Sequence, residues 1–264
     1  MERSKRNKGN FRSGFSLVEL LVAMAITGVV MAAVFKIYTT QQDSYVLQEQ
    51  VAEMQQNGRT AKYVMTREIR MVGYDPTGSN NFGFLSAGVN SIRFSMDIEV
   101  ENGEPDILGE VITYSVSSGN LERNAGSGNE IAVENIEAVG FAYAYDEDND
   151  GDVETCGSDM KWAIDFDGDD FLDLNLDTNG DCKIDIADDA DSDGFIDGTA
   201  IAPSVPIDKI RAVKIWLLAK TGHTDRNYTS ANKYVVGNRI IPLTSDGNRR
   251  QLLATTVKCR NMAL

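Results

Sequence analysis

The chain has 264 residues and a formal net charge of −15, with 40 acidic and 25 basic side chains. Half of the acids lie within residues 146–197, where Lys161 and Lys183 are the only bases, so the rest of the chain is near neutral. This distribution argues against a nucleic-acid partner, because phosphate binding needs a clustered basic face. The length suits one globular domain with attached segments.

A cationic stretch followed by an apolar run forms the N-terminus. Residues 1–14 carry five Lys or Arg side chains, and residues 15–35 carry a single charge, Glu19. A helix of that length can cross about 30 Å of hydrocarbon, and the preceding bases stay in the cytoplasm. We therefore predict a single membrane pass at 15–35, with a cytoplasmic N-terminus.

Glu19 needs a partner in this position, because a carboxylate at mid-bilayer depth costs on the order of 2.5–3.5 kcal/mol on insertion scales. One interpretation is an assembly residue that pairs with a positive charge. The alternative is a tolerated charge that reaches the inner interface, since Glu19 lies one turn from the expected helix start.

The segment GFSLVELLVA, from Gly14 to Ala23, resembles the type III signal of type IV prepilins and type II secretion pseudopilins. The resemblance implies that a prepilin peptidase removes residues 1–14 as a leader peptide by cleaving after Gly14, and then N-methylates Phe15. It also implies that the apolar run anchors the protein in the inner membrane with a periplasmic head, before the protein enters a pilus at the cell surface. In that filament, Glu19 would pair with the terminal amine of a neighbouring subunit. The positive end of the helix dipole, near the new amine, favours a carboxylate there.

One long helix is predicted from residue 15 to about residue 71. Its second half carries an apolar stripe at steps of three and four, which indicates packing on a domain. The stripe consists of Leu47, Val51, Met54, Gly58, Ala61, Met65 and Ile69. A glycine and a proline at 73–76 end the pattern.

Strands follow the helix. Residues 91–96, 110–116 and 139–145 alternate with period two, and a further pair is predicted at 210–218 and 252–259. The fold class is therefore α+β: a pilin-like long N-terminal helix (15–72) packed on an antiparallel β-sheet in a head (73–264), with an acidic loop insert at 146–198.

Three further segments resemble the PilW-type minor pilins: GRTAKYVMTREIRMVGYDPTG, IRAVKIWLLAKT and RRQLLATTVKCRN. The resemblance implies a low-copy subunit at or near the tip of a type IV pilus, which starts assembly with other minor and major pilins. Cys259 departs from the family, which usually has an apolar residue there. Two alternatives stay open: a J-like minor pseudopilin of type II secretion, and a calcium-dependent adhesive module or partner of a tip adhesin.

The acidic insert contains a pattern typical of EF-hand-type calcium loops, in which alternating oxygens surround one cation. The oxygens at positions 1, 3, 5, 7, 9 and 12 come from Asp177, Asn179, Asp181, the Lys183 carbonyl, Asp185 and Asp188. Cys182 replaces the usual glycine at position 6, and Asp188 replaces glutamate, as in dockerin loops. Calcium is the expected occupant, because it is a hard cation that takes six to eight oxygens.

Three more copies are less complete. A second copy supplies Asp189, Asp191, Asp193, the Phe195 carbonyl and Asp197, and meets Ala200 at position 12. Weaker candidates are Asp146, Asp148, Asp150, Asp152 and Glu154, and then Asp165, Asp167, Asp169 and Asp173. Without flanking amphipathic helices, the pattern favours chained calcium loops over EF hands. The alternative is a solvated, disordered acidic loop.

The three cysteines allow three single pairings, and the sequence does not choose between them. An oxidising periplasm would permit a disulfide between Cys156 and Cys182, the most local pair, leaving Cys259 free. No enzyme is predicted: the only histidine, His223, lies in a turn-like segment without a nucleophile motif.

Overall fold

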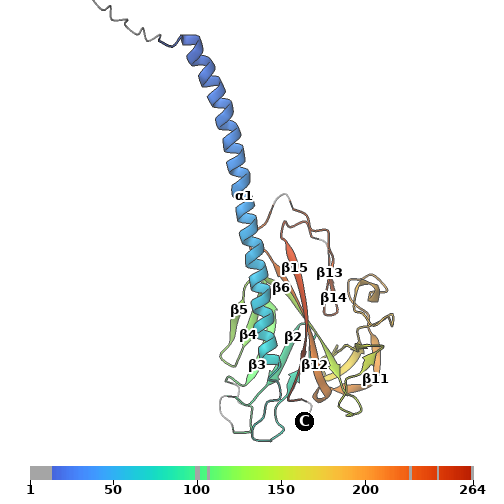
Figure 1. Ribbon diagram of the computed structural model, residues 1–264. Helices are drawn as coiled ribbons and strands as arrows, with labels where there is room; N and C mark the ends of the chain where they lie inside the picture. The colour runs from blue at the N-terminus through green and yellow to red at the C-terminus, as the bar shows by residue number, and fades with distance from the viewer. Residues whose placement is uncertain (1–13, 99–101, 106–107, 226–227, 243, 263–264) are drawn as a thin grey trace, which may run out of the picture. The chain divides into compact units, whose positions relative to one another are not determined.

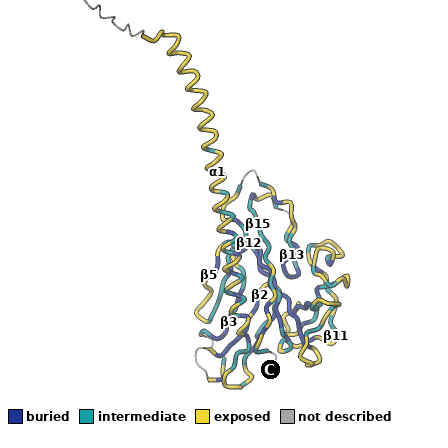
Figure 2. The backbone as a smooth tube through the Cα atoms, in the orientation of Figure 1, coloured by how far each residue is buried: buried dark blue, intermediate teal, exposed yellow. Residues whose placement is uncertain are grey.

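The computed structural model describes residues 14–98, 102–105, 108–225, 228–242 and 244–262. They divide into two compact units, one ending at Glu49 and the other beginning at Gln50. The first unit is the N-terminal part of helix α1 (Leu17–Ile69), whose apolar side chains are largely exposed (Figure 2). This helix is long and apolar enough to cross a membrane. The predicted leader, except for Gly14, lies outside the described residues.

The second unit begins with the remainder of α1, and the predicted helix is confirmed to within two residues at each end. Its buried face consists of Met54, Gly58, Ala61, Met65 and Ile69, all members of the predicted stripe. A side chain at position 58 would meet Leu253 Cδ1 at 2.7 Å, so glycine lets the helix approach the sheet closely. The helix is followed by Gly73, whose φ of 73° favours glycine.

A five-stranded antiparallel sheet follows the order of the chain. Its strands are β1 (Phe84–Ser86), β2 (Ser91–Ser95), β3 (Val111–Ser117), β4 (Asn120–Asn124) and β5 (Asn129–Val133). The turn between β3 and β4 is Ser118-Gly119, with φ of 51° and 76°, the two-residue hairpin form that matches strand twist.

A six-stranded antiparallel sheet has the order β11-β10-β9-β6-β12-β15. Its strands are β6 (Ile136–Tyr145), β9 (Ala163–Ile164), β10 (Phe171–Asn175), β11 (Thr199–Pro206), β12 (Ile210–Lys220) and β15 (Arg250–Lys258). Two hairpins lie outside it: β7 (Thr155–Cys156) with β8 (Asp159–Met160), and β13 (Tyr234–Val236) with β14 (Arg239–Ile241). Two 3-10 turns, η1 (Ile186–Asp188) and η2 (Ile207–Lys209), complete the elements.

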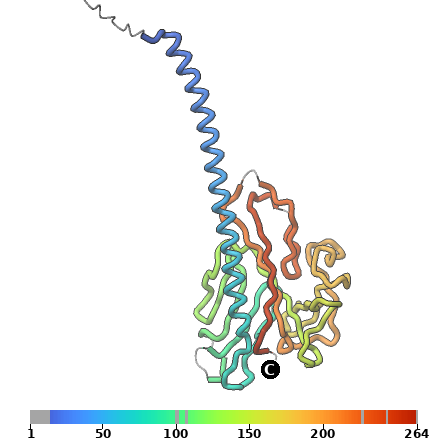
Figure 3. The backbone as a smooth tube through the Cα atoms, in the orientation of Figure 1, coloured from blue at the N-terminus to red at the C-terminus, as the bar shows by residue number. Residues whose placement is uncertain are grey.

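The five predicted strands are confirmed as β2, β3, β6, β12 and β15, and the predicted pair β12–β15 is antiparallel from Ala212–Lys258 to Lys220–Arg250. The insert differs from the predicted loop, because it contains β9 and β10 of the six-stranded sheet, and β11 follows it directly. Residues 146–198 are therefore part of the head's architecture (Figure 1 and Figure 3).

The central strands β6 and β12 are buried on both faces. On β12, Val213, Ile215 and Leu217 belong to the core that contains the stripe of α1. The alternate residues Ala212, Trp216 and Leu218 belong to a second core. That core is completed from the insert and from β13–β14, by Trp162, Ile164, Leu176, Ile196 and Val236. The insert and this hairpin thus cover the face of the sheet opposite to α1.

A charged contact joins the end of α1 to the five-stranded sheet. Glu68 accepts hydrogen bonds from Tyr114 Oη at 2.6 Å and from Arg123 Nε at 3.0 Å. Burial raises the pKa of the Tyr114 hydroxyl, and the hydrogen bond to Glu68 raises it further, so the hydroxyl remains a donor. The contact fixes the rotation of the last turn of α1 relative to β3 and β4.

Gly140 of β6 lies against the turn of the β13–β14 hairpin. A Cβ at this position would lie 2.2 Å from the backbone nitrogen of Gly237, which cannot move without displacing the hairpin. We expect Gly140→Ala to destabilise the protein by about 3 kcal/mol, a melting-temperature loss of roughly 6–12 °C. Thermal unfolding of the full-length protein in detergent measures this.

The control for that substitution is Gly83→Ala. Its Cβ would meet only the flexible Met262 side chain, at 3.4 Å, so the melting temperature should change little. Equal melting temperatures for the two variants would contradict the close seating of the hairpin on β6.

Candidate functional site

Four segments of the insert share one backbone conformation. We name them loop A (146–154), loop B (165–173), loop C (177–188) and loop D (189–197). In each, the carboxylate at position 1 accepts a hydrogen bond from the backbone N–H at position 6, over 2.9 to 3.2 Å. The donors are Gly151, Asp170, Cys182 and Gly194, which bond to Asp146, Asp165, Asp177 and Asp189.

The side chains at positions 3 and 5 repeat the arrangement. Each accepts a hydrogen bond from the backbone N–H two residues later, in all four loops. Position 6 has positive φ in every loop, including Cys182 at 68° and Asp170 at 68°. The two loops that the sequence ranks as weaker, A and B, therefore have the same geometry as C and D.

An apolar side chain at position 8 attaches each loop to the head. Ile184 and Ile196 hold this position in loops C and D, and Val153 and Leu172 hold it in loops A and B. Leu172 is fully buried in the core that contains α1, whereas the other three belong to or pack against the opposite core. The interpretation as a disordered acidic loop is wrong for this part of the chain.

Carboxylates converge in three of the loops. Their ligand atoms lie within 4.8 Å of one another in three groups: Asp146, Asp148 and Asp150; Asp165, Asp167 and Asp169; and Asp189, Asp191 and Asp197. Such spacing is what a single oxygen-bound cation requires. Asp152, Glu154, Asp173 and Asp193 belong to the same loops but to none of these groups.

Asp146 is the most distinctive of these acids. Its side chain is 2% exposed, and its Oδ1 has no hydrogen-bond partner among the described residues. Its Oδ2 accepts a hydrogen bond from the Gly151 amide and lies 3.6 Å from Arg211 Nε. A buried carboxylate oxygen without a partner is destabilising by about 1–3 kcal/mol or more, which a bound cation would offset.

Loop C is arranged differently. Asp188, at position 12, is fully buried and accepts hydrogen bonds from the amides of Thr178, Asn179 and Asp185. It therefore closes the loop back on its own start. Position 3 is Asn179, and Asp177 is grouped with two cysteine sulfurs instead of carboxylates.

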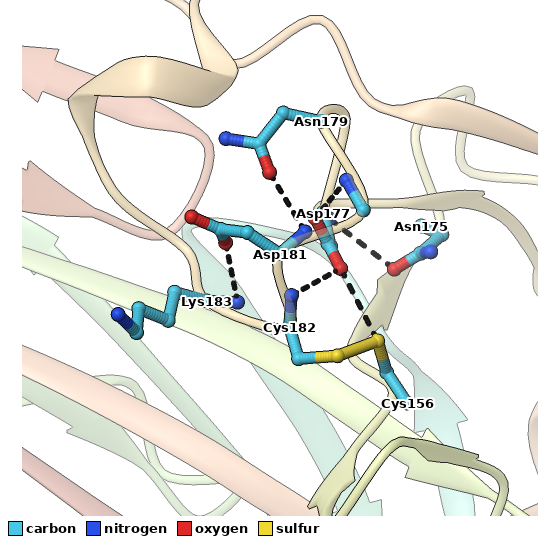
Figure 4. The surroundings of a disulfide bond; sticks show 8 residues. Cys156, Asn175, Asp177, Asn179, Asp181, Cys182 and Lys183 are labelled. Carbon is cyan, nitrogen blue, oxygen red and sulfur yellow. Dashed lines mark hydrogen bonds between the residues drawn. A yellow bond between two sulfur atoms is a disulfide. The ribbon is translucent and has the colours of Figure 1, made fainter.

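Those sulfurs form a disulfide, Cys156–Cys182, with an S–S distance of 1.98 Å (Figure 4). Asp177 Oδ2 lies 3.6 Å from Cys156 Sγ and accepts the Cys182 amide at 2.9 Å. Disulfide sulfurs are not calcium ligands, so in loop C they act as a covalent clamp between β7 and position 6. Cys259 is buried and unpaired, and burial raises the pKa of its thiol to about 12.

Asp173, at position 9 of loop B, has a perturbed carboxyl group. Burial raises its pKa, and the charges of Asp167 and Asp165 raise it further, although the Phe166 amide donates to it. Asp173 therefore keeps a proton to a higher pH than an ordinary aspartate does.

The N-terminal candidates lie at the start of α1, where Phe15 is 85% exposed. Ser16 Oγ accepts the Glu19 amide at 3.2 Å, and Glu19 Oε2 accepts the Ser16 amide at 3.4 Å. This is a capping box, which the spacing Ser-x-x-Glu could have indicated from the sequence. Glu19 therefore has a local hydrogen-bond partner in the single chain.

Comparison with known proteins finds a family motif in this segment. Residues 9–35 match the family described as the prokaryotic N-terminal methylation motif. The chain therefore carries this methylation motif at its N-terminus. A search of curated proteins gave no match for the chain. Among solved structures, it is similar to a type IV-like pilin from Thermus thermophilus, with 19% identity and a TM-score of 0.40 over 81% of this chain and 98% of that one.

The methylation motif includes Gly14, Phe15 and Glu19, the three residues that the sequence identifies as the cleavage site, the methylated residue and the assembly residue. It ends at residue 35, so it does not cover the head, the four loops or the segments that resemble PilW-type proteins.

The position 8 anchor is tested by Ile196→Ala in loop D. Ile196 is 4% exposed, and removing a buried side chain of this size costs about 2–5 kcal/mol. Thermal unfolding of the full-length protein should show a fall in melting temperature. Phe195→Ala, which removes a neighbouring side chain that is 50% exposed, is the control and should change it much less. Equal effects would contradict the anchoring role.

Proposed function

We propose that this protein is a minor pilin of a type IV pilus. A prepilin peptidase processes it at the inner membrane, and it joins other minor and major pilins to start assembly at or near the tip. Its role is structural and not enzymatic. The observation that carries the proposal is the methylation motif at 9–35 on an apolar helix, joined to a β-rich head.

Cleavage between Gly14 and Phe15 would expose a positive amine at the start of α1. In an isolated chain, Glu19 is held by the Ser16 amide, one turn inside the helix. During assembly, the carboxylate of Glu19 would exchange this local bond for the terminal amine of a neighbouring subunit. A charged pair of this kind is strong in a water-free environment. Because it joins one fixed position on each subunit, it would set the direction and the register in which neighbouring helices pack.

We further propose that the insert binds calcium. The buried Asp146 Oδ1, without a partner and grouped with Asp148 and Asp150, supports loop A as a site. Loops B and D have similar carboxylate groups, and loop C offers oxygens on a disulfide-clamped backbone. Extracellular calcium modules bind in the range of about 10⁻⁴–10⁻³ M, which suits a head that ends at the cell surface.

Two other functions use the same features. A J-like pseudopilin of type II secretion would have the same N-terminal motif, and an adhesive module at the pilus tip would use the insert to bind a surface or a tip adhesin. A deletion strain separates them: loss of surface pili with normal secretion supports the minor pilin. Intact pili with lost secretion would favour the pseudopilin, and normal pili with lost calcium-dependent adhesion would favour the adhesive module.

Two substitutions separate the charge of Glu19 from its hydrogen bond in the capping box. Glu19→Gln keeps the hydrogen bond to the Ser16 amide and removes the charge, whereas Glu19→Ala removes both. We expect both variants to be cleaved after Gly14 but neither to enter pili, measured by immunoblotting of sheared filaments.

Glu49→Ala, which removes an exposed acid from the same helix, is the matched control and should assemble normally. Normal incorporation of Glu19→Gln would show that the capping box, and not the charge pair, is what assembly requires.

Calcium binding is tested by thermal unfolding of the full-length protein in detergent, with EGTA or with about 10 mM calcium. For dissociation constants of about 10⁻⁴–10⁻³ M, each occupied loop adds roughly 1.4–2.7 kcal/mol, so the melting temperature should rise by several degrees. Asp146→Asn should reduce this increment. Asp208→Asn, an exposed acid outside the loops, should leave it unchanged. Identical unfolding with EGTA and calcium would refute the metal proposal.

A further inference from the structure

Lys214 lies in an unusual environment in the middle of β12. Its ammonium nitrogen is 5.3 Å from the ring centre of Trp162 and 4.9 Å from that of Trp216. Both indoles are largely buried, and Lys214 itself is partly buried. Among the described residues it has no hydrogen bond and no ion pair, so its positive charge is opposed only by the two aromatic rings and the more distant Asp159.

This environment disfavours a charged lysine. Burial lowers the pKa of the Lys214 ammonium, and the Asp159 charge only partly counteracts the shift. A lysine used only for packing could be replaced by methionine at no electrostatic cost. A partly desolvated ammonium with an unfilled hydrogen-bonding capacity is instead what a site for an anion requires.

A pocket of about 530 Å³ lies beside this ammonium. Its walls come from four parts of the head: β8 and the residue before it, Trp162, the middle of loop C, and the paired strands β12 and β15. Thr256 is directly opposite Lys214 in the β12–β15 register, and Lys183 lies on the wall from loop C. A pocket of this size accommodates a small organic molecule.

The chemistry of the lining restricts the ligand. Lys214 and Lys183 favour one negative group, while Asp159 disfavours a ligand with several negative charges. Ser158, Thr256 and Asp159 offer hydroxyl and carboxylate oxygens, which suit a ligand with several hydroxyl groups. Trp162 adds an apolar aromatic surface against which the C–H face of a ring can lie.

We propose that this pocket binds a saccharide unit that carries one carboxylate, of the uronic acid type, with the carboxylate on Lys214 and the ring hydroxyls on Asp159 and Thr256. The proposal goes beyond the assembly role, since it concerns the face of the six-stranded sheet opposite to α1. It does not require assembly into a pilus, since every residue of the pocket belongs to one chain.

The test compares glucuronate with glucose, which differ by a single carboxylate. Saturation-transfer NMR of the full-length protein in detergent should give a dissociation constant for glucuronate at least about tenfold below that for glucose, the range of a charge-assisted hydrogen bond. Lys214→Met keeps the side-chain length between the indoles and should raise the glucuronate constant to the glucose value. Lys233→Met, an exposed lysine outside the pocket, should leave it unchanged.

Thr256→Val is a second variant, on an exposed position of the edge strand, in case Lys214→Met does not fold. It should weaken glucuronate binding by about three- to tenfold, as expected for one lost hydrogen bond. Absence of glucuronate binding, or equal binding of glucuronate and glucose, would overturn the proposal. Acetate binding as tightly as glucuronate would overturn the saccharide assignment.

Discussion

The burial of β6 and β12 on both faces is the constraint on which the head depends. Side chains alternate along a strand, so packing α1 against Val213, Ile215 and Leu217 leaves Ala212, Trp216 and Leu218 facing the other way. That second apolar face needs a cover, and the cover is built mainly from the most acidic part of the chain. The position 8 residues reconcile these demands, because each loop directs one apolar side chain inward while most of its carboxylates stay exposed or half-buried.

The same arrangement determines the electrostatics of the insert. The positive φ at position 6 turns backbone N–H groups toward the carboxylates, so that amides balance part of the negative charge within each loop. Asp188 is the strongest case, because its carboxylate accepts hydrogen bonds from three backbone amides. Asp146 is the exception, because its Oδ1 has no hydrogen-bond partner among the described residues.

Much of this architecture could be predicted from the sequence. The long helix, its stripe and five strands follow from simple periodicity, and the loop register follows from alternating acids. The strands β9 and β10 were missed because they are short and lie between acidic loops, where composition masks a two- or five-residue apolar pattern. The Lys214 pocket could not be predicted, because it joins residues nearly a hundred positions apart through sheet pairing and a disulfide.

The two faces of the six-stranded sheet also separate the attachment of α1 from the attachment of most of the loops. Tension applied along α1 would enter the head through Met54, Ala61 and Met65 and the strand residues that contact them, all in one core. Most of the loop anchors belong to the other core, and a loop can open there without loosening the helix. A change in the acidic cover would therefore leave the packing of the helix on the sheet largely intact.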